Sequence, residues 1–244
     1  MKRTPGKTPR HGLARTLSKL GVCSRTQAAQ YAREGRVAIN GRVVRDPETP
    51  VDADRDRIAL DGREVRAAGR VYLMLNKPRG YVTTASDERG RETVYALLEG
   101  AGLPWVAPVG RLDKASEGLL LLTNDSAWAA RITAPESHLD KTYHVHIDRT
   151  PDAALLDELR RGIVDDGEPL SARSLREVRR GEKNAWLEIV LDEGRNRQIR
   201  RLLAAHGVGV LRLVRVAIGP LMLGTLAKGA FRALDGAEIA ALAL

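Results

Sequence analysis

The stretch that most constrains the fold of this chain runs from Val109 to Ser126 and reads VGRLDKASEGLLLLTNDS. Its four consecutive leucines lack the alternation of polar and apolar residues that a half-exposed strand shows, so they predict a strand buried on both faces. Asp113 lies in the polar loop before this strand. A carboxylate at the end of a rigid strand is well placed to do chemistry, whereas an aspartate in a loop more often makes a local turn hydrogen bond.

The length and composition of the chain allow one large domain or two unequal ones. It has 244 residues, of which 43% are hydrophobic and 29% are charged. No apolar run approaches the ~18 residues of a membrane helix, and the basic N-terminus lacks the apolar core of a signal peptide. The single cysteine, Cys23, excludes an intramolecular disulfide and a cysteine-rich metal site. We therefore expect a cytoplasmic protein without a membrane partner, and a monomer, because nothing indicates a coiled coil.

The distribution of charge divides the chain more clearly than its total of +9. Residues 1–70 contain 16 Lys and Arg against 8 Asp and Glu, whereas residues 71–244 contain 24 against 23. This asymmetry predicts a basic binding module joined to a nearly neutral body. Because an acidic polymer is the natural partner of such a module, we expect nucleic-acid binding.

The basic part of the chain begins with a predicted disordered tail over residues 1–10. Leucines at helical spacing follow over residues 13–20 and predict a first helix. Ser24 and Gln27 have the spacing of a capping box at the start of a second helix, which Gly35 is expected to end.

Two β-hairpins are expected after these helices. Asn40-Gly41 and Asp61-Gly62 each lie between β-prone runs and suit type I′ turns. Residues 11–66 therefore predict a small domain made of an αα-hairpin and a sheet, and residues 67–70 a linker to the body of the chain.

The body, residues 71–244, mixes strands and helices without a regular repeat. Strands are predicted over 71–77, 119–122, 141–147, 184–191 and 210–223. Helices are predicted over 91–100, 126–134, 151–162 and, after a basic loop, toward 207. This order favours an α+β fold over a doubly wound one.

Several common sites are not indicated by the sequence. It has no GxxxxGK[ST] loop and no GxGxxG, so neither a nucleotide-hydrolysing site nor a dinucleotide or methyl-donor site is expected. His144 and His146 share one face of a predicted strand but have no third ligand nearby, which favours hydrogen-bonded or surface side chains over a metal site. Asp165 and Asp166 precede Gly167 and are interpreted as turn formers. We expect no metal and no cofactor.

The segment LSKLGVCSRTQAAQYAREGRVAINGRVV resembles the small RNA-binding domain of the ribosomal-protein S-four type. The chemistry agrees, because guanidinium and ammonium groups position a protein on RNA phosphates. The alternative for any one of these side chains is an ordinary solvated charge on a helix. The resemblance implies that the following residues face RNA: Arg15, Lys19, Ser24, Arg25 and Arg33.

Four further segments, NKPRGYV, GRLDKASEGLLLLTND, KTYHV and EGRNRQIRRL, together resemble pseudouridine synthases of the RsuA/RluB type, which modify ribosomal RNA. The resemblance extends from about residue 13 to about residue 239 and is closer to the RluB-like large-subunit branch. It implies a mainly antiparallel-sheet catalytic domain over residues 71–244.

The resemblance also implies roles for individual residues. Asp113 is implied as the nucleophile that opens the uridine glycosidic bond, and as a carboxylate it needs no base to activate it. Arg200 is implied to pair with Asp113. Tyr143 is implied to stack beneath the uracil and to assist removal of the proton from carbon 5, and Leu213 to add an apolar floor.

Other cations of these segments have two possible interpretations. Arg111 and Lys77 either bind backbone phosphates around the flipped nucleotide or set the geometry of their loops. Arg195, Arg197 and Arg201 either contact RNA or form structural ion pairs.

These observations together predict a pseudouridine synthase that takes its target uridine out of the base stack. We expect large-subunit (23S) ribosomal RNA as the substrate, either naked or in a precursor particle. The alternatives are a small-subunit (16S) enzyme and a non-catalytic RNA-binding assembly factor. A methyltransferase would need a glycine-rich cofactor loop. The sequence leaves open which uridine is modified, and whether Asp113 attacks the anomeric carbon or carbon 6.

Overall fold

A computed structural model describes residues 11–242 and divides the chain into two compact units. The N-terminal unit contains the chain up to Val71 and two later segments, residues 101–107 and 123–126. The second unit contains the rest, and the predicted tail over residues 1–10 lies outside the described residues. The chain thus passes between units where the predicted linker ends, but the N-terminal unit also takes two segments that the sequence placed in the body.

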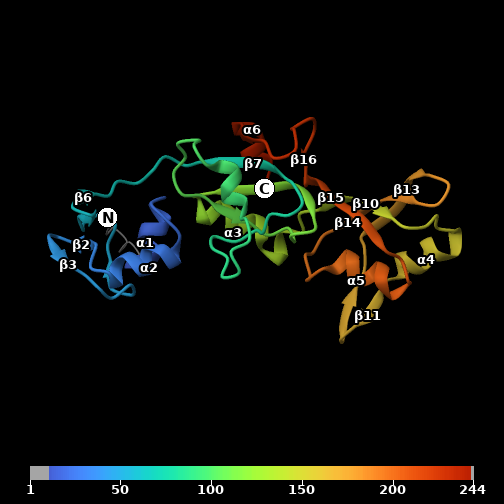
Figure 1. Cartoon of the computed structure of the whole chain (residues 1–244), viewed down its shortest axis with the longest axis horizontal. Helices are drawn as coiled ribbons and strands as arrows, with labels where there is room; N and C mark the ends of the chain where they lie inside the picture. Colours follow the sequence, from blue (N-terminus) through green and yellow to red (C-terminus); the bar gives the residue numbers. More distant parts are fainter. Residues whose placement is uncertain (1–10, 243–244) are drawn as a thin grey trace, which may run out of the picture. The chain divides into compact units, whose positions relative to one another are not determined.

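The N-terminal unit packs two short helices against small sheets (Figure 1). Its strands form the order β3-β2-β5-β6 and a separate pair, β1-β4. Leu13, Leu17 and Cys23 are buried in its core, so Cys23 is a packing residue, and burial raises its pKa to about 11. The elements are β1 (His11–Gly12), α1 (Leu13–Lys19), α2 (Arg25–Arg33), β2 (Val37–Ile39), β3 (Arg42–Val43), β4 (Pro50–Val51), β5 (Ile58–Leu60) and β6 (Arg63–Glu64).

The predicted cap and turns of this unit are confirmed. The Ser24 hydroxyl accepts a hydrogen bond from the Gln27 backbone N–H, and the Gln27 side chain accepts one from the Ser24 N–H, each at 3.1 Å. Asn40 and Gly41 have φ values of 51° and 80°, and Asp61-Gly62 has 52° and 76°. Positive φ at both central residues is what a type I′ turn requires.

The predicted linker is fixed within the N-terminal unit. Asn124 accepts a hydrogen bond from the Val71 N–H and donates one to the Gly69 carbonyl, each at 2.8 Å. Arg70 pairs with Asp125 at 3.2 Å. The TND segment after the leucine strand therefore holds this part of the chain, which explains why residues 123–126 belong to the N-terminal unit.

The second unit is built on a nine-stranded, mainly antiparallel sheet with the order β13-β14-β10-β15-β9-β7-β17. β16 extends β15, β8 pairs with β9, and β11 and β12 form a separate hairpin. This confirms the α+β expectation. The strands are β7 (Tyr72–Lys77), β8 (Ala107–Val109), β9 (Glu117–Thr123), β10 (Lys141–Ile147), β11 (Ile163–Asp165), β12 (Glu168–Leu170), β13 (Ser174–Arg180), β14 (Ala185–Leu191), β15 (Val210–Ile218), β16 (Leu221–Met222) and β17 (Phe231–Ala233).

Helices lie beside this sheet and cover part of it (Figure 1). α4 contacts β13, and α5 contacts the β11-β12 hairpin at β11. Asp152 caps α4, and Gly162 ends it with φ 76°. The helical elements are the 3₁₀ turns η1 (Val94–Leu98) and η2 (Pro135–Ser137) and the α-helices α3 (Ser126–Thr133), α4 (Ala153–Arg161), α5 (Gln198–Ala205) and α6 (Gly236–Ala241).

The leucine strand β9 is the most buried element of the second unit. All seven of its residues are buried, as the uninterrupted apolar run predicted. It pairs in parallel with β15, which places Gly118 opposite Arg215. Leu119 and Leu121 pack with Met74 and Trp128 in the main core. The loop that carries Asp113 is therefore attached to a rigid, central strand.

The two histidines of β10 lie on the sheet face opposite the buried Tyr143. His144 lies 3.3 Å from a Glu188 carboxylate oxygen, and the His146 ring stacks on Trp186 with the ring centres 4.7 Å apart. Within residues 11–242, no group of three or more His, Cys, Asp and Glu side chains is placed to hold a metal ion. None of the helices in that range has the length and apolarity needed to span a membrane.

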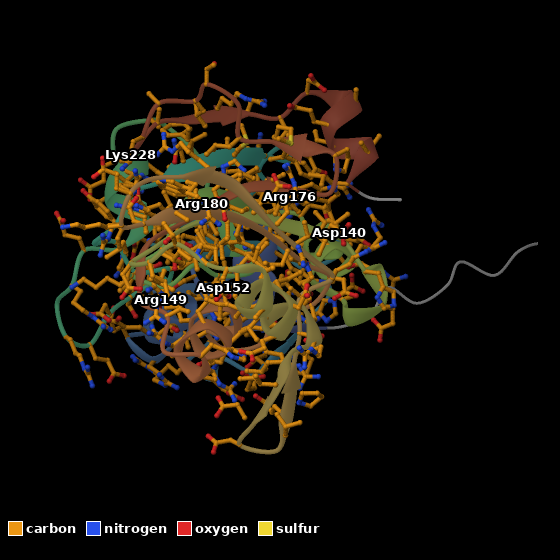
Figure 2. The ribbon with its side chains drawn as sticks, turned by 90° about the vertical axis from the view of Figure 1, so that its right-hand side faces the viewer. Asp140, Arg149, Asp152, Arg176, Arg180 and Lys228 are labelled. Atoms are coloured by element: carbon orange, nitrogen blue, oxygen red, sulfur yellow. The ribbon has the colours of Figure 1, made fainter. Side chains whose placement is uncertain are left out.

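Edge strand β13 carries arginines that are paired with acids. Arg176 pairs with Glu188 and Arg180 with Glu177, each at 2.7 Å, and both arginines are marked in Figure 2. Such exposed pairs contribute little to stability. They neutralise the charges of Arg176 and Arg180, whereas the exposed Arg179 of the same strand lies over the Trp186 ring.

One predicted element differs in type. Residues 91–100 contain a five-residue 3₁₀ turn, η1, instead of an amphipathic α-helix. Five residues are too few to offset the cost of nucleating an α-helix, and 3₁₀ geometry is common in pieces of this length.

Candidate active site

A pocket of about 480 Å³ opens in the second unit next to Asp113. This volume lies within the range of ligand-binding clefts. Residues from β10, β15, the loop before β9 and the loop before α5 line the pocket. The structure thereby brings together the following predicted residues: Arg111, Asp113, Tyr143, Arg197, Arg200 and Leu213.

The loop that carries Asp113 is held from beneath by the NKPRG segment and the residues after it. The Gly80 N–H donates to the Lys114 carbonyl at 2.9 Å. The Thr83 hydroxyl donates to the Leu112 carbonyl at 2.7 Å. The Asp113 carboxylate itself remains 41% exposed toward the pocket. The loop therefore fixes the backbone and leaves the reactive group accessible.

Lys77 is the central support of this loop and not a phosphate-binding group on the surface. Its side chain is fully buried. Its ammonium donates to the carbonyls of Asp113 at 3.0 Å, Ser116 at 2.8 Å and Pro78 at 3.1 Å. Burial lowers the pKa of Lys77 to about 8, against the opposing charges of Asp113 and Glu117. Of the two interpretations of Lys77, the structure favours the structural one.

Tyr143 and Leu213 form the apolar floor of the pocket. They project from neighbouring strands β10 and β15 and are 9% and 5% exposed. The register between these strands shifts beside Tyr143. Such irregularities re-aim side chains next to active sites.

The ion pair of Asp113 differs from the expected one. A guanidinium nitrogen of Arg197 lies 3.7 Å from the Asp113 carboxylate. Arg200 instead donates to the Ala115 carbonyl at 3.2 Å, and no ion pair within 4.0 Å joins it to Asp113 in the described structure. Burial lowers the pKa of Arg200, and the neighbouring charge of Arg197 lowers it further. The Arg200 side chain thus contacts the backbone of the Asp113 loop and not the Asp113 carboxylate.

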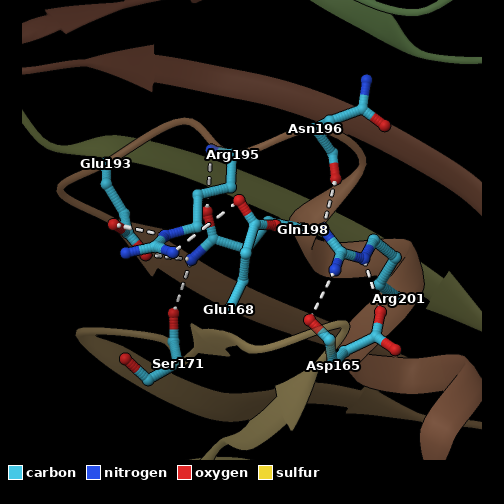
Figure 3. A network of polar contacts seen from close by, with 8 residues as sticks. All are labelled: Asp165, Glu168, Ser171, Glu193, Arg195, Asn196, Gln198 and Arg201. Carbon is cyan, nitrogen blue, oxygen red and sulfur yellow. Dashed lines mark hydrogen bonds and ion pairs between the residues drawn. The ribbon is translucent and has the colours of Figure 1, made fainter.

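Arg197 has an unusual backbone conformation at the start of α5. Its φ of 49° lies in the left-handed region, which residues other than glycine rarely adopt. Such conformations persist only where the surroundings enforce them. The residues on both sides of Arg197, namely Arg195, Asn196 and Gln198, belong to the network of polar contacts drawn in Figure 3.

Gln198 is the buried centre of that network (Figure 3). Its amide nitrogen donates to the Ser171 carbonyl at 2.9 Å and to Glu193 at 2.8 Å. Its amide oxygen accepts from the Arg195 N–H at 3.1 Å. Arg195 in turn pairs with Glu193 at 2.9 Å. Arg195 is therefore a structural residue of this loop as well as part of the pocket wall.

Arg201 ties α5 to the β11-β12 hairpin (Figure 3). Its guanidinium donates to Asp165 and, at 2.7 Å, to Glu168. Asp166 and Gly167 turn the hairpin with φ values of 51° and 76°, as expected for turn formers. The structural interpretation of Arg201 is thus favoured.

The sequence did not single out two cations of the site. Arg79 is exposed, donates to the Leu211 carbonyl at 3.3 Å, and its charge acts on Arg200. Arg215 is buried at the pocket floor. Arg79 directly follows Asn76-Lys77-Pro78, so the turn that indicated Lys77 could also have indicated Arg79. Arg215 lies two residues after Leu213 on the same strand face, so the prediction for Leu213 could have been extended to Arg215.

The basic residues predicted in the N-terminal unit fall into two groups. Arg15, Lys19 and Arg25 are exposed, and the charges of Arg15 and Arg25 add to burial in lowering the pKa of Lys19. Ser24 is 5% exposed and its hydroxyl serves the helix cap, which favours a structural role. Arg33 is exposed at the last residue of α2.

Comparisons with known proteins identify the family of this chain. The family model described as RNA pseudouridylate synthase matches residues 71–205, and the S4 domain model matches residues 12–58. A protein of Aquifex aeolicus (strain VF5) named as an RNA pseudouridine synthase is 40% identical over 93% of this chain and 91% of its own length. The ribosomal large subunit pseudouridine synthase B of Bacillus subtilis (strain 168) is 35% identical, with 93% of each chain covered.

A solved structure shows the same architecture. The crystal structure of a pseudouridylate synthase is 31% identical, covers 96% of this chain and 100% of its own, and superposes with a TM-score of 0.65. In this chain the two family models place an S4 domain before a catalytic domain. This chain belongs to the RNA pseudouridylate synthase family.

Proposed function

We propose that this pseudouridine synthase modifies a uridine of large-subunit ribosomal RNA and that Asp113 is its nucleophile. The observation that carries the proposal is the exposed Asp113 carboxylate at a pocket floored by Tyr143 and Leu213. The name of the Bacillus subtilis relative supports the large-subunit target. We also propose a monomer that acts in the cytoplasm; the chain has one cysteine, Cys23, and needs no disulfide.

The reaction keeps every heavy atom of the substrate. The bond between N1 of uracil and the anomeric carbon breaks, and a bond from carbon 5 to the anomeric carbon forms. Carbon 5 loses its proton and N1 gains one. Asp113 attacks either the anomeric carbon or carbon 6, and its loop, fixed by Lys77, holds the carboxylate in place.

The cations at the pocket have a different task from that of Asp113. Arg197 and Arg111 line the pocket and are exposed, and Arg79 is an exposed cation whose charge acts on Arg200. We assign these three cations to the phosphates that flank the flipped nucleotide. The stacking surface for the base is the ring of Tyr143. Removal of the carbon 5 proton is assigned to the same side chain.

Tritium release distinguishes the large-subunit from the small-subunit target. Transcripts of 23S and 16S RNA labelled with tritium at carbon 5 of uridine are incubated with wild-type enzyme, both naked and in precursor particles. We expect release from 23S RNA and none from 16S RNA. Release from 16S RNA alone would identify a small-subunit enzyme, and no release from any substrate would favour a non-catalytic assembly factor.

Lys77→Met is expected to lower the rate constant of release by about 10- to 100-fold, because two carbonyls of the Asp113 loop, those of Asp113 and Ser116, lose their donor. Affinity for RNA should change less than about twofold. With a pKa of about 8, Lys77 loses a proton and one N–H donor as the pH rises through that value. The wild-type rate should therefore carry a component that falls above about pH 8 and that is missing in the variant. An unchanged rate and pH profile would show that the loop does not depend on Lys77.

Replacing Arg15 and Arg25 together by Gln is expected to weaken RNA binding about tenfold at ~0.15 M salt and to reduce the salt slope by about 1.4 to 1.8. The matched control is Arg55 and Arg66 replaced by Gln, which removes the same charge from arginines that pair with Asp52 and Glu64. Filter binding over a salt series measures both. Equal losses in the two double variants would mean that only net charge matters and that Arg15 on α1 and Arg25 on α2 are not RNA contacts.

A further inference from the structure

Arg215 is the least explained charged residue of the second unit. It projects from β15 into the floor of the pocket and is only 5% exposed. Its Nε donates to the Leu119 carbonyl at 2.8 Å. Its Nη2 is buried and has no hydrogen-bond partner in the described structure. A buried donor in this state costs free energy, so its position calls for a functional explanation.

The charge of Arg215 is also not neutralised by a direct ion pair within residues 11–242. The nearby Lys77 and Lys141 both have pKa values lowered by burial, and Arg215 adds to that lowering. Glu117 on the adjoining strand β9 forms ion pairs with Arg212 at 3.0 Å and Lys228 at 2.6 Å, and none with Arg215 in the described structure. An uncompensated buried cation is unfavourable unless a ligand brings an acceptor to it.

A second guanidinium nitrogen of the pocket is also buried without a hydrogen-bond partner. The Nε of Arg200 is buried and unpartnered, although its Nη2 is bound to the Ala115 carbonyl. Tyr143 and Leu213 line the same pocket as Arg200 and Arg215. The pocket thus contains two guanidinium donors together with the apolar surfaces of Tyr143 and Leu213.

The depth of these donors decides which part of a nucleotide they meet. Arg197 at the rim is 51% exposed, and Arg111 is also exposed. The phosphates of a flipped nucleotide stay at the rim because the RNA chain continues on both sides. Only the base reaches the floor, and its acceptors there are carbonyl oxygens.

We propose that Arg215, with the Nε of Arg200, reads the two carbonyl oxygens of uracil, a role that rests on the proposed function. A half-turn of uracil about the line from N3 to carbon 6 exchanges N1 with carbon 5 and O2 with O4. Two donors that hold the base before this rotation therefore meet oxygens again after it. Cytosine has an amino group in place of O4, so one guanidinium N–H would face another N–H donor. Such a mismatch is strongly rejected.

The test compares Arg215→Met, Arg215→Lys and a control, Arg179→Gln. Arg179 is an exposed residue of β13 whose guanidinium lies over the ring of Trp186 on β14. Single-turnover tritium release from 23S transcripts, RNA affinity over a salt series and thermal unfolding are measured for each. We expect about 100-fold slower release for Arg215→Met and about 10-fold slower release for Arg215→Lys, which keeps one charge but not the fork. Affinity and salt slope should stay at wild-type values. The Tm of Arg215→Met should fall by less than about 2 °C, because the loss of the hydrogen bond to Leu119 is offset by removal of the buried, unpartnered Nη2.

Three results would overturn this role. Release by Arg215→Met within about twofold of wild type would show that Arg215 does not bind the base. A salt slope reduced by about one would identify a phosphate contact instead. A large fall in Tm that Arg215→Lys does not rescue would identify a structural role. Absence of release by the wild-type enzyme is a separate result, which would overturn the proposed function and this role together.

Discussion

Asp113→Asn is expected to abolish tritium release, with a loss of at least about 1,000-fold in the rate constant. Asparagine keeps the size of the side chain and the backbone hydrogen bonds that Lys77 and Ser116 make to residue 113. It removes the negative charge that attacks the substrate and that Arg197 faces at 3.7 Å. Affinity for RNA should remain equal or rise, because removal of a negative charge reduces repulsion of phosphates.

The matched control for this variant is Asp166→Asn. Asp166 turns the β11-β12 hairpin with φ 51°, a conformation that asparagine also tolerates. Its release rate should stay within about twofold of wild type, and both variants should unfold at the wild-type temperature. Wild-type release by Asp113→Asn would refute the assignment of the nucleophile.

Gly118→Ala is expected to destabilise the second unit by roughly 3 kcal/mol or more, because two costs combine. Gly118 has φ 101°, and an added Cβ would lie 2.3 Å from the Arg215 carbonyl oxygen and 2.8 Å from its nitrogen. Both atoms belong to the backbone of β15, which pairs with β9 at this point. The clash can be relieved only by separating the two strands that position Asp113 and Leu213.

Gly80→Ala separates the two costs. Gly80 has nearly the same φ, 99°, but no atom lies within 4 Å of an added Cβ. It should therefore show only the conformational cost of about 1–2 kcal/mol. Chemical denaturation of both variants measures the difference, which we attribute to the close approach of β9 and β15. Equal destabilisation of the two variants would mean that this approach is not constraining.

The elements with strong local signals were predictable from the sequence. The leucine run of β9, the capping box at Ser24 and the two type I′ turns depend on neighbouring residues alone, and all are found. β13 was not predicted because most of its residues are exposed, so no apolar periodicity marks it. α6 was also not predicted, although Asp235 and Glu238 form a capping box that the spacing of these two residues indicates.

The sequence predicted several of the residues that line the pocket, but not which of them contact one another. The motifs identified Asp113, Tyr143 and Leu213, and all three line one pocket. The sequence could not show that Arg197, and not Arg200, approaches the Asp113 carboxylate. Arg197 has a left-handed backbone conformation, and the adjacent Gln198 is held by the Ser171 carbonyl, a contact distant in sequence.

The burial of Lys77 could likewise not be predicted from the sequence. Lysine is almost never fully buried unless its charge is paired. Here three backbone carbonyls accept from it, and two of them belong to residues 113 and 116, far along the chain. A partner of this kind leaves no side-chain signature, so only the fold shows that Lys77 supports the catalytic loop.

The most direct test of the account is a count of pseudouridine in exhaustively modified RNA. A 23S transcript or precursor particle is incubated with excess enzyme and digested to nucleosides, and pseudouridine is quantified against uridine. We predict one pseudouridine per transcript with the wild-type enzyme and none with Asp113→Asn. Equal pseudouridine with both proteins, or none with the wild type on either form of the RNA, would contradict the claim that Asp113 in this pocket isomerises a ribosomal uridine.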